Sequence, residues 1–213
     1  MTWTMLLALA GMGVVAGILA GLLGVGGGLI LVPVLVWVME GSGMTQDVQH
    51  LALGTSLAVM VFTSFASVRA HHQHGAVDWG IVRRFAPPIV LGTLLGTQVA
   101  GWLPSRELRW FFVLYAYVIA VQMLLDAKPK GGRALPGVLG LSGVGGLIGL
   151  ISSFVGIGGG SMSVPFMTWC NVPMQRAIAT SAALGWPIAL SGTLGYMLSG
   201  WGRTGLPAYS AGF

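Results

Sequence analysis

The sequence predicts an all-α, polytopic membrane protein made of two inverted repeats, each containing a glycine-rich broken or re-entrant helix. Of the 213 residues, 55% are hydrophobic and only 7% are charged, whereas charged residues make up about 25% of an average soluble domain. Long stretches carry no charge, for example between Arg133 and Arg176, and each can hold a helix of about 17 to 25 apolar residues. A glycine run followed by Val-Pro also occurs twice, at residues 24–33 and 156–165, which indicates a duplicated unit.

Four spans and one short arm are predicted in the first repeat, residues 1–126. The spans are residues 3–23, 50–68, 85–103 and 110–125, and the arm is residues 29–39. As a helix, the arm is about 16 Å long at roughly 1.5 Å per residue, so we expect it to re-enter the membrane rather than cross it. Gly92 and Gly96 lie one turn apart in the third span, a spacing typical of tight helix crossings in membranes.

The second repeat, residues 135–213, follows a linker at residues 127–134 and repeats the same order. Its predicted elements are a span at 135–155, an arm at 161–169 and a span at 177–198. The match continues past the prolines, because residues 49–56 (QHLALGTS) resemble residues 174–181 (MQRAIATS). Counterparts of the spans at 85–103 and 110–125 are missing. We therefore expect either a chain that is truncated relative to its relatives or a shortened one that completes its site as a homo-oligomer.

Cationic residues predict the orientation, because Lys and Arg concentrate in cytoplasmic loops. If each glycine break turns the chain back, the first repeat crosses an odd number of times and the second begins on the opposite side. The cations inside are then Arg69, Arg83, Arg84, Lys128, Lys130, Arg133 and Arg176, against Arg106, Arg109 and Arg203 outside. We expect a multi-pass protein of the cell inner membrane, surrounded by lipid.

The two glycine breaks are the candidate binding site. Irregular backbone inside a bilayer survives only where it is buried in protein or lines a wet cavity. After each break a half-helix begins with unpaired N–H groups, whose partial positive charge favours a small anionic substrate without any cationic side chain. The residues predicted to contact this substrate at the breaks are Gly26, Gly27, Gly28, Leu29, Gly158, Gly159, Gly160 and Ser161.

Four hydroxyl side chains occupy matched positions in the two repeats and extend this candidate site. They are Thr55, Ser56, Thr180 and Ser181. Such hydroxyls can donate to substrate oxygens, or they can bond a preceding carbonyl of their own helix, as Ser and Thr commonly do in membrane helices. The sequence leaves both alternatives open.

Other function classes lack their motifs. No GxxxxGK[ST] sequence is present, and Leu29 and Ser161 stand where G-x-G-x-x-G requires glycine, so no nucleotide cofactor is expected. His71, His72 and His74 share one short loop without a second ligand cluster, which predicts no metal site.

The net charge of +5 is spread over loops, which favours membrane topology over nucleic-acid binding. The spans contain no Ser/His/Asp constellation, so an enzyme is not expected.

Several longer motifs resemble the sulfite exporter TauE/SafE family of membrane permeases. They are GLLGVGGGLILVPVL (21–35), GTS (54–56), HGAVDW (74–79), PPIVLGTLLGT (87–97) and SSFVGIGGGSMSVPFM (152–167). The resemblance implies a polytopic inner-membrane carrier, built from two related halves, for sulfur-containing anions such as sulfite, sulfonates or sulfoacetate.

Together these observations predict a secondary membrane transporter, an exporter or permease, that moves a small sulfur oxyanion or sulfonate by alternating access around the two glycine breaks. Two alternatives stay open. An anion channel would be served by the same half-helix dipoles. A membrane partner protein that does not transport would account for the missing final spans.

Overall fold

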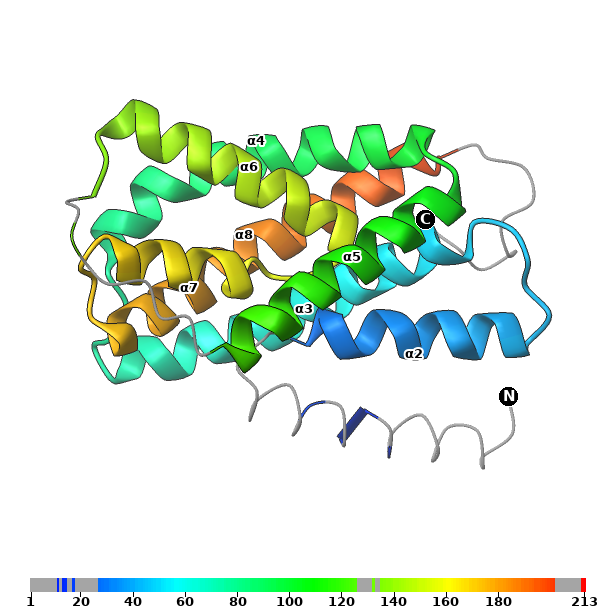
Figure 1. The fold of residues 1–213 in the computed structure, drawn as a ribbon, viewed down its shortest axis with the longest axis horizontal. Helices are drawn as coiled ribbons and strands as arrows, with labels where there is room; N and C mark the ends of the chain where they lie inside the picture. The colour runs from blue at the N-terminus through cyan, green and yellow to red at the C-terminus, as the bar shows by residue number, and fades with distance from the viewer. Residues whose placement is uncertain are drawn as a thin grey trace.

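The structure is a computed structural model that describes residues 11, 13, 14, 17, 27–125, 132, 135–201, 212 and 213. Over these residues it is helical and contains no strand, which confirms the all-α fold class. The helices are α2 (Gly28–Gly41), α3 (Val48–Gln73), α4 (Trp79–Trp102), α5 (Ser105–Leu124), α6 (Val138–Val155), α7 (Gly160–Trp169) and α8 (Met174–Ser199) (Figure 1). Most of the predicted span at 3–23, Gly26 and most of the linker lie outside the described residues.

The described helices match the predicted spans, and several extend beyond them. α3 continues past Val68 to Gln73, and α4 begins at Trp79 rather than at residue 85. The early start of α4 has a local cause, because Asp78 Oδ1 accepts hydrogen bonds from the amides of Gly80 (3.0 Å) and Ile81 (3.1 Å) and thereby caps the helix. Four described helices, α3, α5, α6 and α8, are long and apolar enough to cross a membrane.

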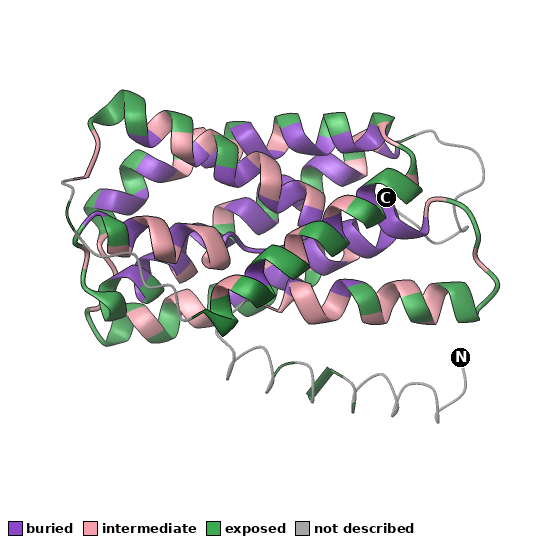
Figure 2. Cartoon of the chain, viewed as in Figure 1, coloured by how far each residue is buried: buried purple, intermediate pink, exposed green. Residues whose placement is uncertain are grey.

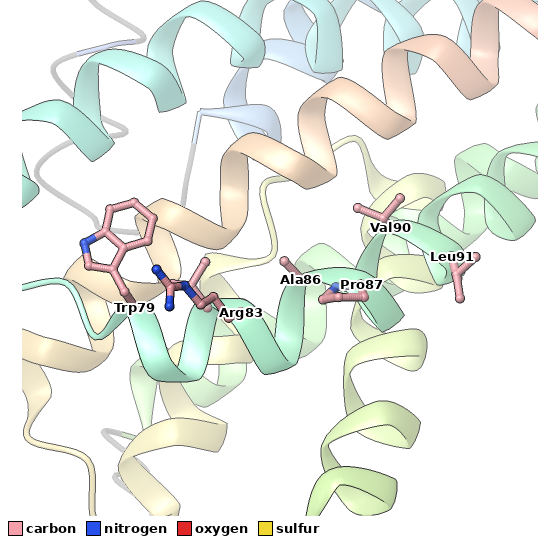
Figure 3. A pocket seen from close by; sticks show the side chains of 7 residues that line it. Trp79, Arg83, Ala86, Pro87, Val90 and Leu91 are labelled. Atoms are coloured by element: carbon pink, nitrogen blue, oxygen red, sulfur yellow. The ribbon is translucent and has the colours of Figure 1, made fainter.

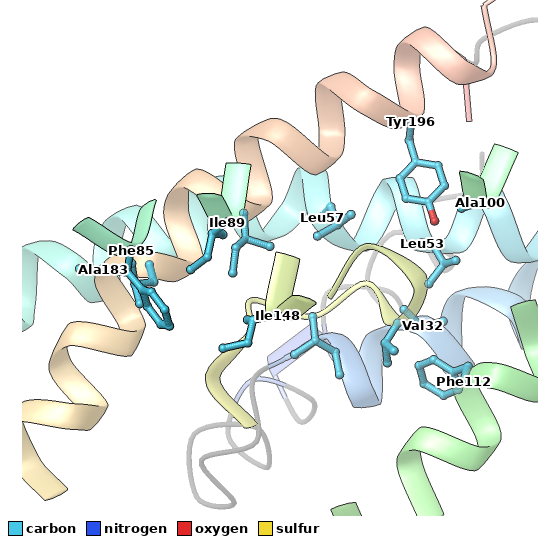
Figure 4. Packing of buried hydrophobic residues seen from close by; sticks show 14 of the residues in the cluster. Val32, Leu53, Leu57, Phe85, Ile89, Ala100, Phe112, Ile148, Ala183 and Tyr196 are labelled. Carbon is cyan, nitrogen blue, oxygen red and sulfur yellow. The ribbon is translucent and has the colours of Figure 1, made fainter. Parts of the chain in front are cut away.

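Two closely packed helix pairs form the core. α3 packs along α8, α4 packs along α6, and α4 also contacts α8. The approach of α4 to α6 depends on glycine, because a Cβ atom at Gly92 would overlap the carbonyl of Gly146. Leu53, Leu57 and Ile148 belong to the buried cluster between these helices (Figure 4). The spacing of Gly92 and Gly96 thus serves a tight helix crossing, as predicted.

The two short helices leave the middle of the molecule in opposite directions. α2 runs from the middle toward the right of Figure 1, and α7 runs from the middle toward the left. With 14 and 10 residues, both are shorter than the roughly 20 residues that cross a bilayer. Each turns back into a long helix that packs against it, α3 or α8. Buried residues gather in this middle region, whereas α5 is largely exposed (Figure 2).

Candidate functional site

The second glycine segment interrupts the chain between α6 and α7. Gly156 ends α6 with a left-handed conformation, φ 69°, and the amides of Gly156 and Ile157 donate to the Ser152 carbonyl at 2.8 and 3.2 Å. Gly159 begins α7 with φ 72°, and its carbonyl accepts from the amides of Met162 and Ser163 at 3.1 and 2.9 Å. Both positions require glycine, because left-handed backbone strains any residue that carries a Cβ.

This segment lies deep in the protein, and residues 156–159 are all buried. It passes between α3 and α8: a Cβ at Gly158 would lie 2.7 Å from Met60 Cε and 3.6 Å from the Gly185 Cα. A Cβ at Gly159 would lie 2.7 Å from Ile188 Cδ1. The surroundings therefore leave no space for larger side chains at these positions.

The first glycine segment meets the second one. A Cβ at Gly28 would overlap the Gly156 carbonyl and would lie 3.1 Å from the Ile157 Cα. Gly27 precedes α2, and its carbonyl accepts from the amides of Ile30 and Leu31 at 3.2 and 2.9 Å. Leu29, in the first turn of α2, is partly buried against the core. The structure thus brings Gly28 of the predicted site against the second glycine segment.

Two of the four predicted hydroxyls lie at the glycine segments. Ser56 Oγ donates to the Gly156 carbonyl at 3.0 Å. Ser181 Oγ lies 2.7 Å from Ser163 Oγ, which donates to the Gly159 carbonyl at 2.9 Å. Because Ser163 has one hydroxyl proton and directs it to that carbonyl, Ser181 is the donor in the pair. Gly160 is close by, since a Cβ there would lie 3.6 Å from Ser181 Oγ.

The other two hydroxyls lie elsewhere. Thr180 Oγ1 accepts from the Asp78 amide at 3.0 Å and so ties α8 to the loop before α4. Thr55 is partly buried and makes no hydrogen bond through its side chain to the rest of the described chain. Ser161, at the start of α7, pairs with the Tyr115 hydroxyl of α5 at 2.6 Å. Of the matched pairs, the structure therefore brings the serines to the glycine segments and not the threonines.

Ser152 also lies beside the second glycine segment, although the sequence prediction did not include it. It is 2% exposed, and its hydroxyl has no hydrogen-bond partner among the residues that the structure describes. A Cβ at Gly159 would lie 3.3 Å from Ser152 Oγ, so this hydroxyl faces the start of α7. Its position one helical turn before Gly156, in the Ser152-Ser153 pair, is the sequence signal that could have drawn attention to it.

The electrostatic character of this region comes from backbone. The described atoms nearest to the glycines of residues 156–160 belong to apolar side chains, serines and backbone, and none of these neighbours is a charged side chain. The amino-terminal end of α7 carries a partial positive charge, equivalent to about half an elementary charge in an ideal helix. The arrangement can therefore bind a small anion through N–H and O–H donors alone.

Two surface hollows lie apart from the glycine segments. The larger, about 830 Å³, is lined only by α4 residues, among them Trp79, Arg83 and Pro87 (Figure 3). The other, about 390 Å³, is lined by α5 residues, including Trp110 and Tyr117. Both are open and mainly apolar, as expected of surfaces that face lipid. No group of three or more His, Cys, Asp or Glu side chains with metal-site geometry occurs in the described part of the chain.

Known proteins resemble this chain over most of its length. A family model described as Sulfite exporter TauE/SafE matches residues 9–212. A probable membrane transporter protein of Haemophilus influenzae is 37% identical over 207 residues, covering 94% of this chain and 77% of that protein. The probable membrane transporter protein YunE of Bacillus subtilis is 28% identical, covering 89% and 77% respectively. Sulfite exporter TauE/SafE family protein 3 of Arabidopsis thaliana is 26% identical over 134 residues, which are 60% of this chain and 25% of that protein. No solved structure matches the chain.

Proposed function

Given that this chain belongs to the sulfite exporter TauE/SafE family and is a membrane transporter, we propose that it is a secondary carrier for a small sulfur-containing anion such as sulfite or an organosulfonate. The observation that carries the proposal is the contact of the two glycine segments inside the protein, where Gly28 lies against Gly156 and α7 begins. A half-helix that begins at buried, irregular backbone is a recurrent substrate site of secondary transporters.

The chemistry of this region favours an anion over a cation or a neutral molecule. A cation would need carbonyl or carboxylate ligands, but the Gly156 and Gly159 carbonyls already accept hydrogen bonds from Ser56 and from Ser163. The donors without an acceptor in the described chain are the amides of residues 158–161 and the Ser152 hydroxyl, and they lie at the positive end of α7. That the anion contains sulfur comes from the family alone.

Alternating access is supported by the arrangement of the short helices. Because residues 156–159 are buried, an anion reaches them only if the surrounding helices move. The hairpins α2–α3 and α7–α8 leave the centre in opposite directions (Figure 1), as expected if the repeats are inverted in the membrane. Rocking of one hairpin against the other would then open the centre to each side in turn.

The distribution of charge supports an inner-membrane orientation. The α3–α4 and α7–α8 connections lie at the left end of Figure 1, and the α2–α3 and α4–α5 connections lie at the right end. Near the left connections the sequence carries Arg69, Arg83, Arg84 and Arg176 with Asp78, and near the right ones it carries Glu40, Asp47 and Glu107 with Arg106 and Arg109. Under the positive-inside rule the left end is cytoplasmic.

Transport of radiolabelled sulfite into liposomes that contain the purified chain tests the proposal. We expect saturable uptake that Gly159→Leu abolishes, because left-handed backbone and the contact with Ile188 both oppose a side chain there. Gly41→Ala is the matched control, since a Cβ at Gly41 meets nothing within 4 Å. Wild-type liposomes that take up no more sulfite than empty ones would contradict the proposal. Single-channel currents carried by sulfite would favour the anion channel instead.

A further inference from the structure

We propose that the anion is held by the second glycine segment, through the amides of residues 159–161 together with the Ser152 hydroxyl. This inference rests on the proposed function and refines it, because it assigns the ligands to one of the two glycine segments and adds a residue outside both. Ser152 is a binding residue in this account, and its role is to donate a hydrogen bond to an oxygen of the oxyanion.

The Ser152 hydroxyl differs from the other buried serine hydroxyls nearby. Ser153, its neighbour, donates to the Leu150 carbonyl at 2.7 Å, and Ser191 donates to the Pro187 carbonyl at 2.6 Å. Ser and Thr in helices usually satisfy themselves in this way. Ser152 has no partner in the described part of the chain although it is 2% exposed, and leaving a buried hydroxyl unsatisfied is unfavourable. A ligand oxygen at the start of α7 would satisfy it.

The backbone beside Ser152 presents further donors. The amide of Ile157 donates to the Ser152 carbonyl and that of Met162 donates to the Gly159 carbonyl. The four amides between them, at residues 158–161, have no acceptor in the described structure. Gly159 is left-handed and Gly160 is the first helical residue of α7. Successive residues of opposite handedness turn their N–H groups toward one point and form a concave anion-binding nest.

The matching residues of the first repeat lack these hydroxyls. At the glycine segments the repeats are offset by 156 − 24 = 132 residues, so Ser152, Ser161 and Ser163 correspond to Ala20, Leu29 and Leu31. In the structure the first segment contributes Gly28 and Val32, which pack against Gly156. The described part of the first segment therefore offers no hydroxyl that corresponds to Ser152, and we assign the ligands to the second segment.

The donor set selects the class of ligand. Three consecutive amides and a hydroxyl supply several hydrogen bonds directed at one point, which suits the oxygens of sulfite or of a sulfonate group. The surrounding side chains, Met60, Ile148 and Ile188, are apolar and leave the charge to be compensated by hydrogen bonds and the α7 dipole. Loss of the hydroxyl should therefore weaken binding without removing it.

Ser152→Ala and Ser153→Ala form a matched pair for the test, because both residues are buried serines of α6 and only Ser153 has a partner. The measurement is the sulfite dissociation constant of the full chain in detergent, obtained from the rise of the thermal unfolding midpoint with sulfite concentration. We expect Ser152→Ala to raise this constant about tenfold, the loss of one hydrogen bond to a charged group. Ser153→Ala should leave it within about twofold.

The unfolding midpoint without sulfite separates binding from a structural role. Ser152→Ala removes an unsatisfied polar group, so its midpoint should equal or exceed that of the wild type. A lower midpoint, or a dissociation constant that Ser152→Ala leaves unchanged, would overturn the role of Ser152. In either case, sulfite binding by the wild type would still uphold the proposed function. A wild type that neither binds nor transports sulfite would overturn both. Methanesulfonate in place of sulfite should show the same dependence on Ser152, since both anions present oxygens bonded to sulfur.

Discussion

The Cα atom of Gly28 lies so close to the carbonyl group of Gly156 that a Cβ at residue 28 would overlap both the oxygen and the carbon of that carbonyl. The contact joins the first residue of α2 to the last turn of α6 and brings the two glycine segments of the duplicated sequence together. Because it is made by backbone on both sides, a change of side chain at Gly28 cannot be absorbed by a rotamer change.

Gly28→Ala is therefore expected to destabilise the protein. Overpacking of a well-packed interior typically costs about 1–3 kcal/mol, and here the clash is with backbone. Thermal unfolding in detergent should show a lower midpoint than the wild type. Gly27→Ala is the control, because Gly27 has φ −58° and a Cβ there would meet nothing within 4 Å. Equal midpoints for the two variants would contradict the close contact.

Ser56→Ala should destabilise the second glycine segment. The Ser56 hydroxyl is the donor to the Gly156 carbonyl at 3.0 Å, and a buried carbonyl left without a donor costs about 1–3 kcal/mol. We expect lower thermal stability and slower sulfite uptake. Thr55→Ala, one residue earlier, should change the stability by less than about 0.5 kcal/mol. If Thr55→Ala were the more damaging change, the assignment of the serine to the site would be wrong.

Gly92→Ala should separate α4 from α6, because the new methyl group would overlap the carbonyl of Gly146. Small residues at such crossings allow helices in membranes to approach closely. Reduced yield of monodisperse protein and a lower unfolding midpoint are expected. Gly146→Ala lies at the same crossing but places its Cβ at an ordinary 3.8 Å from the Pro88 carbonyl oxygen, so it should be tolerated. Similar losses in both variants would argue against a specific contact at Gly92.

Single cysteines introduced in a Cys170→Ala background test the inverted arrangement. Cys170 is the only cysteine of the sequence, so this background carries no other thiol. Ser42 in the α2–α3 connection and Gln175 at the start of α8 are both exposed. Inverted repeats require that a membrane-impermeant maleimide added to intact cells label only one of Ser42→Cys and Gln175→Cys, and the proposed orientation makes Ser42→Cys the labelled one. Labelling of both from the same side would exclude the inversion.

The helices themselves could be predicted from the sequence because bilayer crossing depends on local properties. Charge-free stretches indicated where α3, α5, α6 and α8 lie, and the glycine run followed by Val-Pro, which occurs twice, indicated the duplication. The ends were less accurate. Helix α4, for example, begins earlier than its apolar stretch, because the cap at Asp78 extends it into polar sequence.

The candidate site was predicted only in part, because the partner of each hydroxyl is set by packing. Ser152 and Ser153 are identical neighbours in the sequence, yet one finds a carbonyl within its own helix and the other faces Gly159 without a partner. Thr180 was expected at the site and instead accepts from the Asp78 amide. A position on a helix surface does not reveal which donor or acceptor lies opposite it.

By itself, the sequence determined that this chain forms apolar helices in a membrane and that two glycine-rich segments interrupt them. Each glycine makes a continuous helix less favourable by about 1 kcal/mol. Hydropathy and backbone preference act within a few residues, so they can be read along the chain. Only the tertiary structure decided that Gly28 meets Gly156 and that Ser152 faces the start of α7. The contact of Gly28 with Gly156 joins segments far apart in the sequence. Both arrangements depend on how α3, α6 and α8 pack together, because close packing and the pairing of buried polar groups are properties of the whole bundle.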